Sequence, residues 1–379
     1  MIRRLTVCRA AGTDPYENLA LEQTLLERVR ENACILYLWQ NARTVVIGRN
    51  QNPWKECRTA LLEEEGGHLA RRLSGGGAVF HDLGNLNFTF LMREADYDLD
   101  RQLTVIETAC RSLGIPVERS GRNDLLADGR KFSGNAFYHH NGRAYHHGTL
   151  MVDVDLEMVQ RYLSPSKAKL AAKGVDSVRS RVVNLREFLP DLTVERLSDA
   201  LTAAFAEVYD QAIGNSQQAI EDGGRGESLV TNHQSPRDGE SGSKELSTEK
   251  AFPPEKRRPE GAGEVVPVER ISPDEFDLRE LRAKYASDGW LYGPKMPFTL
   301  SVEDRFPWGG VEIQLQVNEG IIRAAKVYTD AMDETLAPRL EAVLTDCAFR
   351  PAHLHSAVSE LHIPPEQEAA ILLLLASVL

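Results

Sequence analysis

The chain has 379 residues, of which 42% are hydrophobic and 26% are charged, enough apolar material for two or three domains of ordinary size. Acidic residues outnumber basic ones by 56 to 44, a net charge of −12, which is the opposite of the balance typical of nucleic-acid binders. The N-terminal arginines precede no apolar run, the longest apolar tract (369–379) is too short to cross a bilayer, and five scattered cysteines lack CxxC spacing. We therefore expect a soluble, cytoplasmic protein that binds neither nucleic acid nor membrane and has no disulfide framework.

Residues 214–264 differ in composition from the rest of the chain, because they consist mostly of Gly, Ser, Pro, Gln and charged residues. Such a segment cannot bury enough apolar surface to offset the entropy lost on ordering. We interpret it as a flexible polar linker that joins a large domain (1–213) to a smaller one (265–379).

The first predicted helix begins at Asp14, a capping residue that is followed by Pro15 and by Glu17 three positions after the cap. An apolar stripe at helical spacing continues to Val29. Short apolar runs predict strands at 35–39, 44–48, 68–73 and 85–91. Helices are expected from Pro53 to the glycines at 66–67 and over 104–113.

Two dipeptides predict hairpins. Asp128-Gly129 separates strand-like residues 124–127 from 130–132, and Asn141-Gly142 separates 136–140 from 143–147; both dipeptides favour the primed turns that join antiparallel strands. The second hairpin would pair His140 with Arg143. This pattern indicates an α+β fold with a mainly antiparallel sheet. In the smaller domain, 311–317 alternates as a strand and 336–344 forms a helical apolar face.

The segment RRLSGGGAVFHDLGNLN at 71–87 carries the strongest chemical signal. Consecutive glycines let a backbone approach a ligand closely, and adjacent arginines with free N–H groups suit a phosphate or carboxylate. The segment is neither a Walker A loop nor a GxGxxG fingerprint. Taken alone, the glycines are equally compatible with a purely structural hairpin.

Two further segments have cationic character. Lys131 follows the first hairpin turn and precedes small residues, where an ammonium group could reach into a cleft, although a single strand lysine is more often solvated. Residues 164–184 hold five basic side chains against one acid, which suggests a loop closing over an anion or simply a solvated face. The histidines at 139, 140, 146 and 147 alternate between faces and do not predict a metal site.

Together and in this order, these segments resemble the lipoate–protein ligase A family, over most of the chain outside the linker. RRLSGGGAVFHDLGN at 71–85 is similar to the family signature RRxSGGGAVxHDxGN, and GRNDLLADGRKFSGNA at 121–136 is similar to its GRNDL…RKxSGxA stretch. HHGTLMVDVDL and LAAKGVDSVRSRVVNL resemble its acyl-pocket strand and adenylate-binding loop. The upstream stretch TVVIGRNQNPWKEC also matches, and GWLYGPKMPF and WGGVEIQLQVNEGII resemble the family's small accessory domain.

The resemblance implies a biotin/lipoate-ligase catalytic domain of the class II synthetase type at 1–213 and a small α+β accessory domain at 265–379. It implies that (R)-lipoate and Mg·ATP give lipoyl-AMP and pyrophosphate. The lipoyl group would then pass to a lysine of apo lipoyl domains in 2-oxoacid dehydrogenase acyltransferase subunits or of the glycine-cleavage H protein. We expect a monomer, with Mg²⁺ bound through ATP rather than by a dedicated protein cluster.

Lys131 falls on the family's catalytic lysine, and its cation would stabilise charge on the acyl oxygen in both half-reactions. The positions that the resemblance assigns to ATP or the adenylate are Arg72, Gly77, Ala78, Val79, Phe80, Asn123, Asp124, Lys131, Lys173 and Arg179. The positions that it assigns to lipoate are Gly75, Gly76, Lys131, His81, Ser133, His147 and Gly148.

Three alternatives stay open at this level. A carrier-dependent octanoyl- or lipoyl-transferase would use a cysteine nucleophile, but no cysteine lies between Cys110 and Cys347. A transferase that accepts preformed lipoyl-AMP would keep the same pocket. A non-catalytic lipoate sensor would bind lipoate without turning over ATP.

Overall fold

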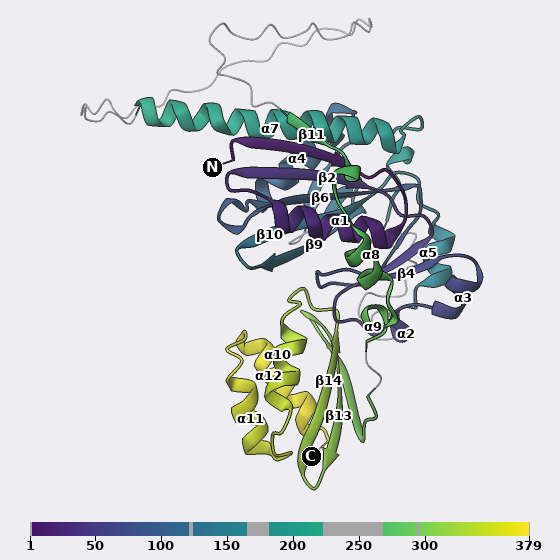
Figure 1. The fold of residues 1–379 in the computed structure, drawn as a ribbon, viewed down its shortest axis with the longest axis vertical. Coiled ribbons are helices and arrows are strands. Elements are labelled where there is room, and N and C mark those ends of the chain that lie inside the picture. The colour runs from purple at the N-terminus through teal and green to yellow at the C-terminus, as the bar shows by residue number, and fades with distance from the viewer. Residues whose placement is uncertain (1, 121–123, 165–181, 223–267, 294–295, 379) are drawn as a thin grey trace, which may run out of the picture.

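The computed structural model describes residues 2–120, 124–164, 182–222, 268–293 and 296–378. Its large domain is built on an eight-stranded sheet (Figure 1). In spatial order the strands are β11 (Val268–Ile271), β1 (Arg4–Arg9), β2 (Ala33–Trp39), β6 (Asn85–Arg93), β10 (Arg143–Met151), β9 (Arg130–His140), β8 (Asp124–Ala127) and β7 (Glu118–Ser120). The two pairings of β1 are parallel and the others are antiparallel, which confirms the mainly antiparallel α+β prediction.

Helices cover both faces of this sheet (Figure 1). On one face α4 (Leu99–Ser112) and α7 (Val194–Asp222) bury the main core, which includes Phe88 and Phe90 of β6. On the other face lies α1 (Pro15–Arg28), capped by Asp14 as expected. The alternate residues of β6 face α1, and because β6 is central they are buried as well. Within the described ranges, no helix is long and apolar enough to cross a membrane.

A second, three-stranded sheet has the order β4 (His68–Arg71), β3 (Thr44–Ile47), β5 (Val79–His81). It carries α2 (Pro53–Glu56), α3 (Thr59–Glu64) and α5 (Leu156–Tyr162). The single helix expected from Pro53 to the glycines at 66–67 is wrong: Cys57 adopts an extended conformation and bridges to Leu163, because its backbone pairs with a distant part of the chain.

Both predicted hairpins are confirmed. Asp128-Gly129 and Asn141-Gly142 have positive φ at both positions, as a primed turn requires, and His140 pairs with Arg143. One detail differs from the prediction. Residues 130–132 and 136–140 belong to one continuous strand, β9, because the irregularity between them is a bulge opposite Leu125 and Leu126 rather than a break.

The segment 268–293 packs on the large domain, although the sequence grouped it with the smaller one. β11 adds to the edge of the large sheet beside β1, and α8 (Arg279–Ala286) packs on α1. The short helices η4 (Pro273–Glu275) and α9 (Asp288–Leu291) flank α8. The composition of a four-residue strand does not indicate which sheet it will join, so the sequence could not assign β11 to the large domain.

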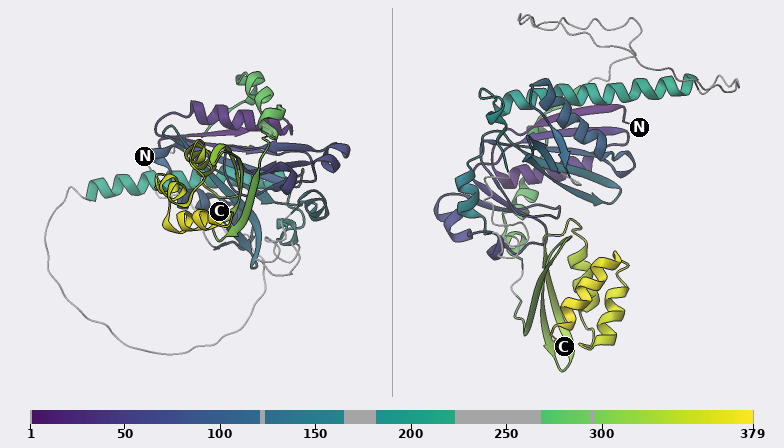
Figure 2. Two further views of the ribbon diagram at one scale, coloured as in Figure 1. Left: turned by 90° about the horizontal axis from the view of Figure 1, so that it is seen from below. Right: turned by 180° about the vertical axis from the view of Figure 1, so that it is seen from behind.

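The C-terminal domain has its own core. An antiparallel sheet of β12 (Leu300–Phe306), β13 (Gly309–Asn318) and β14 (Ile321–Thr329) is covered on one face by helices (Figure 2). These helices are α10 (Leu336–Leu344), α11 (Pro351–Ser359) and α12 (Pro365–Ala376). The strand predicted at 311–317 and the helix predicted at 336–344 are both confirmed.

Candidate functional site

The glycine turn, Ser74 to Gly77, lies between β4 and β5 and faces the C-terminal domain. Gly76 has φ of +86°, a conformation that L side chains rarely adopt. A Cβ on Gly75 would lie 2.5 Å from the backbone oxygens of both Ala331 and Met332. These glycines therefore permit an unusual backbone and a close approach between two chain segments.

The two arginines before this turn are buried and hold it in place. Arg71 donates to the carbonyls of Gly48, Arg49, Gln51 and Leu291 at 2.6–3.2 Å. Arg72 donates to four acceptors in and beside the turn, which are Val46 O, Ser74 Oγ, Gly75 O and Gly77 O. Burial lowers the pKa of each guanidinium to about 10, so both stay charged at neutral pH. The structure thus gives Arg72 a role in shaping the turn; nucleotide contact stays a prediction.

A buried hydrogen-bond chain connects the turn to α1. His147 Nε2 lies 2.8 Å from Ser74 Oγ, and His147 Nδ1 lies 2.9 Å from Glu22 Oε1. Ser74 Oγ accepts a hydrogen bond from Arg72 Nε, so its own hydroxyl can donate to His147 Nε2. With Nε2 as the acceptor, the ring proton of His147 lies on Nδ1, which donates to Glu22. Glu22 also accepts from Thr89 Oγ1 at 2.7 Å. Glu22, Ser74 and His147 are at most 7% exposed, so this chain fixes the turn rather than presenting a nucleophile to solvent.

His81 presents a neutral donor beside this chain. Asn18 Nδ2 donates to Asn41 Oδ1, which orients the Asn41 amide so that its Nδ2 donates to His81 Nδ1 at 3.2 Å. Burial, with Arg72 and His147 nearby, lowers the pKa of His81 to about 3. The neutral ring therefore carries its proton on Nε2, which is buried without a partner, and a buried donor without a partner needs an explanation such as a ligand.

A second buried donor without a partner belongs to Asn87, a residue that the sequence did not single out. Its Oδ1 accepts from Asn85 Nδ2 at 2.9 Å, whereas its Nδ2 is buried without a partner. Asn87 pairs with Trp39 across one strand boundary and with Thr149 across the other, and the Trp39 ring lies 6.1 Å from that of His81. The period-2 pattern Asn85, Asn87, Thr89 against three large apolar residues could have signalled a polar site face on a central strand.

Lys131 lies at the start of β9, which is separated from β6 by β10. Its Nζ forms an ion pair with Asp124 Oδ1 at 2.6 Å, and both side chains remain more than a third exposed. A Cβ on Gly134 would lie only 3.4 Å from Lys131 Cε and Nζ, so the lysine folds across this glycine. Gly134 N donates to Thr149 Oγ1. Two strand spacings, about 10 Å, thus separate Asn87 from Gly134, the residue over which the end of the Lys131 side chain lies.

Of the other predicted site residues, some can reach a ligand near the glycine turn, some face the opposite side of the sheet, and some lie outside the described residues. Phe80 buries its ring against Tyr162, so only its backbone is available to a ligand, whereas Gly77 is exposed. Ser133 pairs with Leu125, which lies in the core under α4 and α7, so register puts its hydroxyl on the side away from Lys131. The Cβ direction at Gly148 points at Asn135 and Phe88, again on that side. Asn123, Lys173, Arg179 and nearly all of the basic segment lie outside the described residues.

The four histidines do not gather. His139 pairs with Glu94, and His146 is buried between Gln102 and Asn135 with its pKa lowered to about 3 by burial. Among the residues that the structure describes, no group of three His, Cys, Asp or Glu side chains could hold a metal ion.

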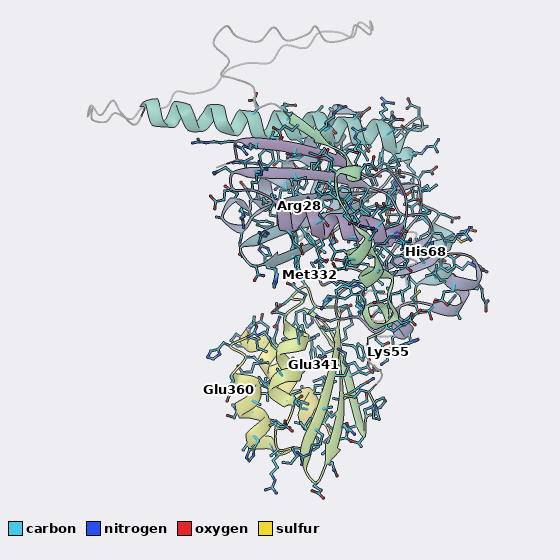
Figure 3. The ribbon with its side chains drawn as sticks, in the orientation of Figure 1. Arg28, Lys55, His68, Met332, Glu341 and Glu360 are labelled. Carbon is cyan, nitrogen blue, oxygen red and sulfur yellow. The ribbon has the colours of Figure 1, made fainter. Side chains whose placement is uncertain are left out.

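The C-terminal domain reaches the glycine turn directly. Gly76 N donates to Ala331 O at 3.1 Å, and Thr329 N donates to Asn50 O at 2.9 Å. Lys55 forms ion pairs with Glu303 and Glu312 of the small sheet. Figure 3 shows Met332 and Lys55 at the boundary of the two domains. The loop after β14 therefore packs directly against the glycine turn.

Two family models match the chain. The model of the lipoyl protein ligase A/B catalytic domain matches residues 14–206, and that of the bacterial lipoate protein ligase C-terminus matches residues 295–373. The structure of P. falciparum LipL1 in complex with lipoate is 25% identical, with a TM-score of 0.73, and the match covers 97% of this chain and 99% of that one.

A bipartite lipoate protein ligase from Thermoplasma acidophilum, described with its E2 lipoyl domain, is 21% identical with a TM-score of 0.56. That match covers 78% of this chain and 99% of the other, and it shows the shared fold. The catalytic-domain model spans more than half of the chain, and its range includes the glycine turn, His81, Asn87, Lys131 and His147. The chain therefore belongs to the lipoyl protein ligase A/B family and is an enzyme of the lipoate–protein ligase type.

Proposed function

We infer that this enzyme activates (R)-lipoate with ATP to lipoyl-AMP, releases pyrophosphate, and transfers the lipoyl group to a lysine of an acceptor protein. The observation that carries the proposal is the position of Lys131. Its partly exposed ammonium is held by one carboxylate and lies over the face of the large sheet that presents the unmatched donor of Asn87. The unmatched donor of His81 comes from β5 of the second sheet, where the His81 ring contacts Trp39, the strand neighbour of Asn87. Lipoate binding by the similar P. falciparum protein supports the choice of acid.

The chemistry follows from charge. A carboxylate and a triphosphate repel each other, so activation needs a cation and oriented N–H donors at the reacting oxygens. Lys131 can exchange Asp124 for the acyl oxygen, because both partners are partly solvated and their ion pair is correspondingly weak. His81 Nε2 and the Asn87 amide can donate to oxygens of the bound acid without adding charge. Covering the mixed anhydride would exclude the water that hydrolyses it.

ATP would be the second substrate, near the exposed Gly77 and the partly buried Ala78 and Val79. The described residues lack a carboxylate cluster for a metal, so Mg²⁺ would be held mainly by the nucleotide phosphates and would neutralise their charge. The proposed acceptors are lipoyl domains of 2-oxoacid dehydrogenase acyltransferase subunits and the glycine-cleavage H protein. The pairing of the archaeal relative with an E2 lipoyl domain supports this class of partner.

The test is pyrophosphate release by purified protein with Mg·ATP and (R)-lipoate, with and without an apo lipoyl domain. Lys131→Ala should abolish lipoate-dependent release, because it removes the ammonium that Asp124 holds over Gly134. Arg130→Ala is the matched control, because this neighbouring cation pairs with Glu187 outside the site; its release should stay near that of the unaltered protein.

The acceptor should gain the mass of one lipoyl group. Transfer from synthetic lipoyl-AMP without pyrophosphate release would reassign the enzyme as a transferase. Lipoate binding without either activity would indicate a sensor.

A further inference from the structure

A hollow lined mainly by arginines lies at the end of the large sheet remote from the glycine turn. Its volume is about 540 Å³, and its lining residues are Arg3, Arg4, Arg30, Glu31, Asn32 and Arg93. Arg93 ends β6, whose first residue, Asn85, lies near the turn. Eight residue steps along a strand span about 27 Å, so this hollow is separate from the candidate ligase site.

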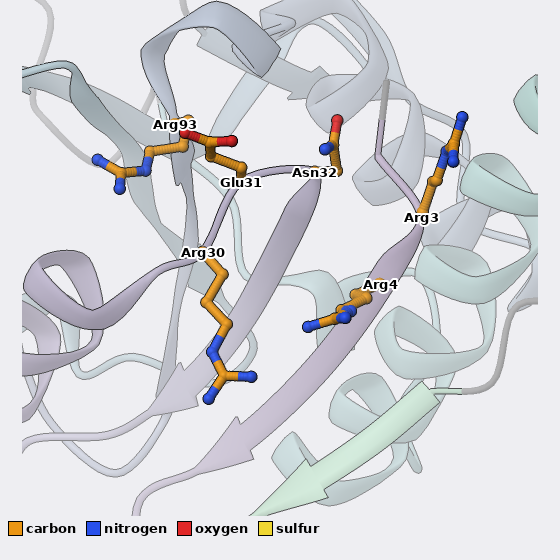
Figure 4. Close-up of a pocket in the computed structure, with 6 residues that line it drawn as sticks. All are labelled: Arg3, Arg4, Arg30, Glu31, Asn32 and Arg93. Atoms are coloured by element: carbon orange, nitrogen blue, oxygen red, sulfur yellow. The ribbon is translucent and has the colours of Figure 1, made fainter.

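The guanidinium groups around this hollow have no carboxylate partners. Four arginines face one lining glutamate, and within the described ranges none of these guanidinium groups makes an ion pair or hydrogen bond. Other arginines of this acid-rich chain are paired: Arg9 with Asp199, and Arg186 with Asp153. Figure 4 shows the side chains of Arg3, Arg4, Arg30 and Arg93 extending from separate segments in different directions.

A further arginine, Arg143, does not line the hollow itself but neighbours one of the residues that do. Arg143 on β10 lies directly opposite Arg93 on β6, and directly opposed residues of an antiparallel pair share one face with their Cβ atoms about 5 Å apart. Like charges placed this way repel each other. In both side chains Nε is also buried without a hydrogen-bond partner. The fold thus places two arginines, each with an unmatched Nε, at directly opposed positions of neighbouring strands.

We propose that this hollow binds a small, polyvalent oxyanion of the phosphate type, separately from lipoate and ATP. Guanidinium forks bind phosphate oxygens through paired N–H donors, and a bound anion would remove the repulsion between Arg93 and Arg143. The hollow is large enough for a di- or triphosphate group, and its lining has an excess of three positive charges by side-chain type. The net charge of −12 disfavours a nucleic acid as the occupant.

The test is calorimetric titration of the full chain with inorganic tripolyphosphate, without Mg²⁺ and at constant ionic strength. The double variant Arg93→Gln/Arg143→Gln should weaken binding by about tenfold or more, since two charged forks are lost. The matched control Arg186→Gln/Arg196→Gln removes the same charge from exposed ion pairs; it should change the affinity less than about twofold. Lys131→Ala should leave the titration unchanged.

Three results would overturn the proposal: no saturable binding to the unaltered protein, equal weakening in the control, or loss of binding in Lys131→Ala. Equal affinity for citrate would overturn the phosphate class. The thermal midpoint of the double variant checks its fold, and Arg4→Gln/Arg30→Gln provides a second pair from other segments. Lipoate-dependent pyrophosphate release should persist in the double variant, so failure of this proposal is distinguishable from failure of the ligase assignment.

Discussion

Replacing Glu22 with alanine is expected to destabilise the large domain strongly, because this buried carboxylate accepts two hydrogen bonds. His147 Nδ1 lies 2.9 Å from Glu22 Oε1, and Thr89 Oγ1 lies 2.7 Å from the same oxygen. Alanine would leave both donors buried and unpaired. Each unpaired donor costs about 1–3 kcal/mol, so the free energy of unfolding should fall by about 2–6 kcal/mol.

Glu22→Gln separates the hydrogen bonds from the charge. A glutamine carbonyl can still accept from both donors, and the variant loses only the charge-assisted part of each bond, offset by the lower cost of burying a neutral group. We therefore expect its unfolding free energy to stay within about 1 kcal/mol of the unaltered protein. Its KM for lipoate should rise if the proposed function is right, because His147 and the turn would be held less firmly.

The assay is urea unfolding followed by tryptophan fluorescence, together with pyrophosphate release at varied lipoate. Glu27→Ala is the matched control on the same helix, since Glu27 is exposed and, among the described residues, accepts a hydrogen bond from Gln23 alone. The reasoning about the buried chain would be refuted by a Glu22→Ala protein that is no less stable than Glu27→Ala.

Three further outcomes are expected. Gly75→Ala should loosen the docked C-terminal domain, because its Cβ would clash with two backbone oxygens, and small-angle scattering should show a larger radius of gyration. Gly77→Ala is the control and should leave the radius of gyration unchanged, because a Cβ there has no atom within 4 Å. Asn87→Asp should raise the KM for lipoate with little change in the KM for ATP, because a carboxylate replaces the unmatched donor; an equal rise in both would contradict this. Glu334 lies at the boundary of the two domains, where its carbonyl accepts from Asn50 Nδ2, and burial there, together with the charge of Asp333, raises its pKa to about 7 from 4.5. Docking should therefore weaken as pH rises from 4.5 through 7, and Glu334→Gln should abolish that dependence in scattering measured at about pH 5 and 8.

Much of the secondary structure could be predicted because its signals are local. The Asp14 cap, the Asp-Gly and Asn-Gly turns and the alternation at 311–317 each act within a few residues, and the structure has all of them. The helix expected from Pro53 failed because the backbone of Cys57 pairs with that of Leu163, about one hundred positions away. The placement of β11 in the large sheet was missed for the same reason, since no local pattern specifies a partner strand.

The candidate site divides in the same way. The glycine turn, Lys131 and His147 stand in recognisable motifs, whereas Glu22 and Asn87 were missed because their importance depends on what faces them. Glu22 interrupts the apolar face of a helix. Only the packing of α1 on β6 and β10 shows that His147 and Thr89 donate hydrogen bonds to its carboxylate.

By itself, the sequence determined the hairpins, the helix caps and the identity of the chemical groups, because these depend on the conformational preferences of neighbouring residues. Only the tertiary structure decided which groups meet. It turned Arg71 and Arg72 inward to hold the glycine turn, placed the loop after β14 against that turn, and left the donors of His81 and Asn87 without partners. The physical reason is that burial and hydrogen-bond satisfaction are set by contacts between distant segments, which no local pattern specifies.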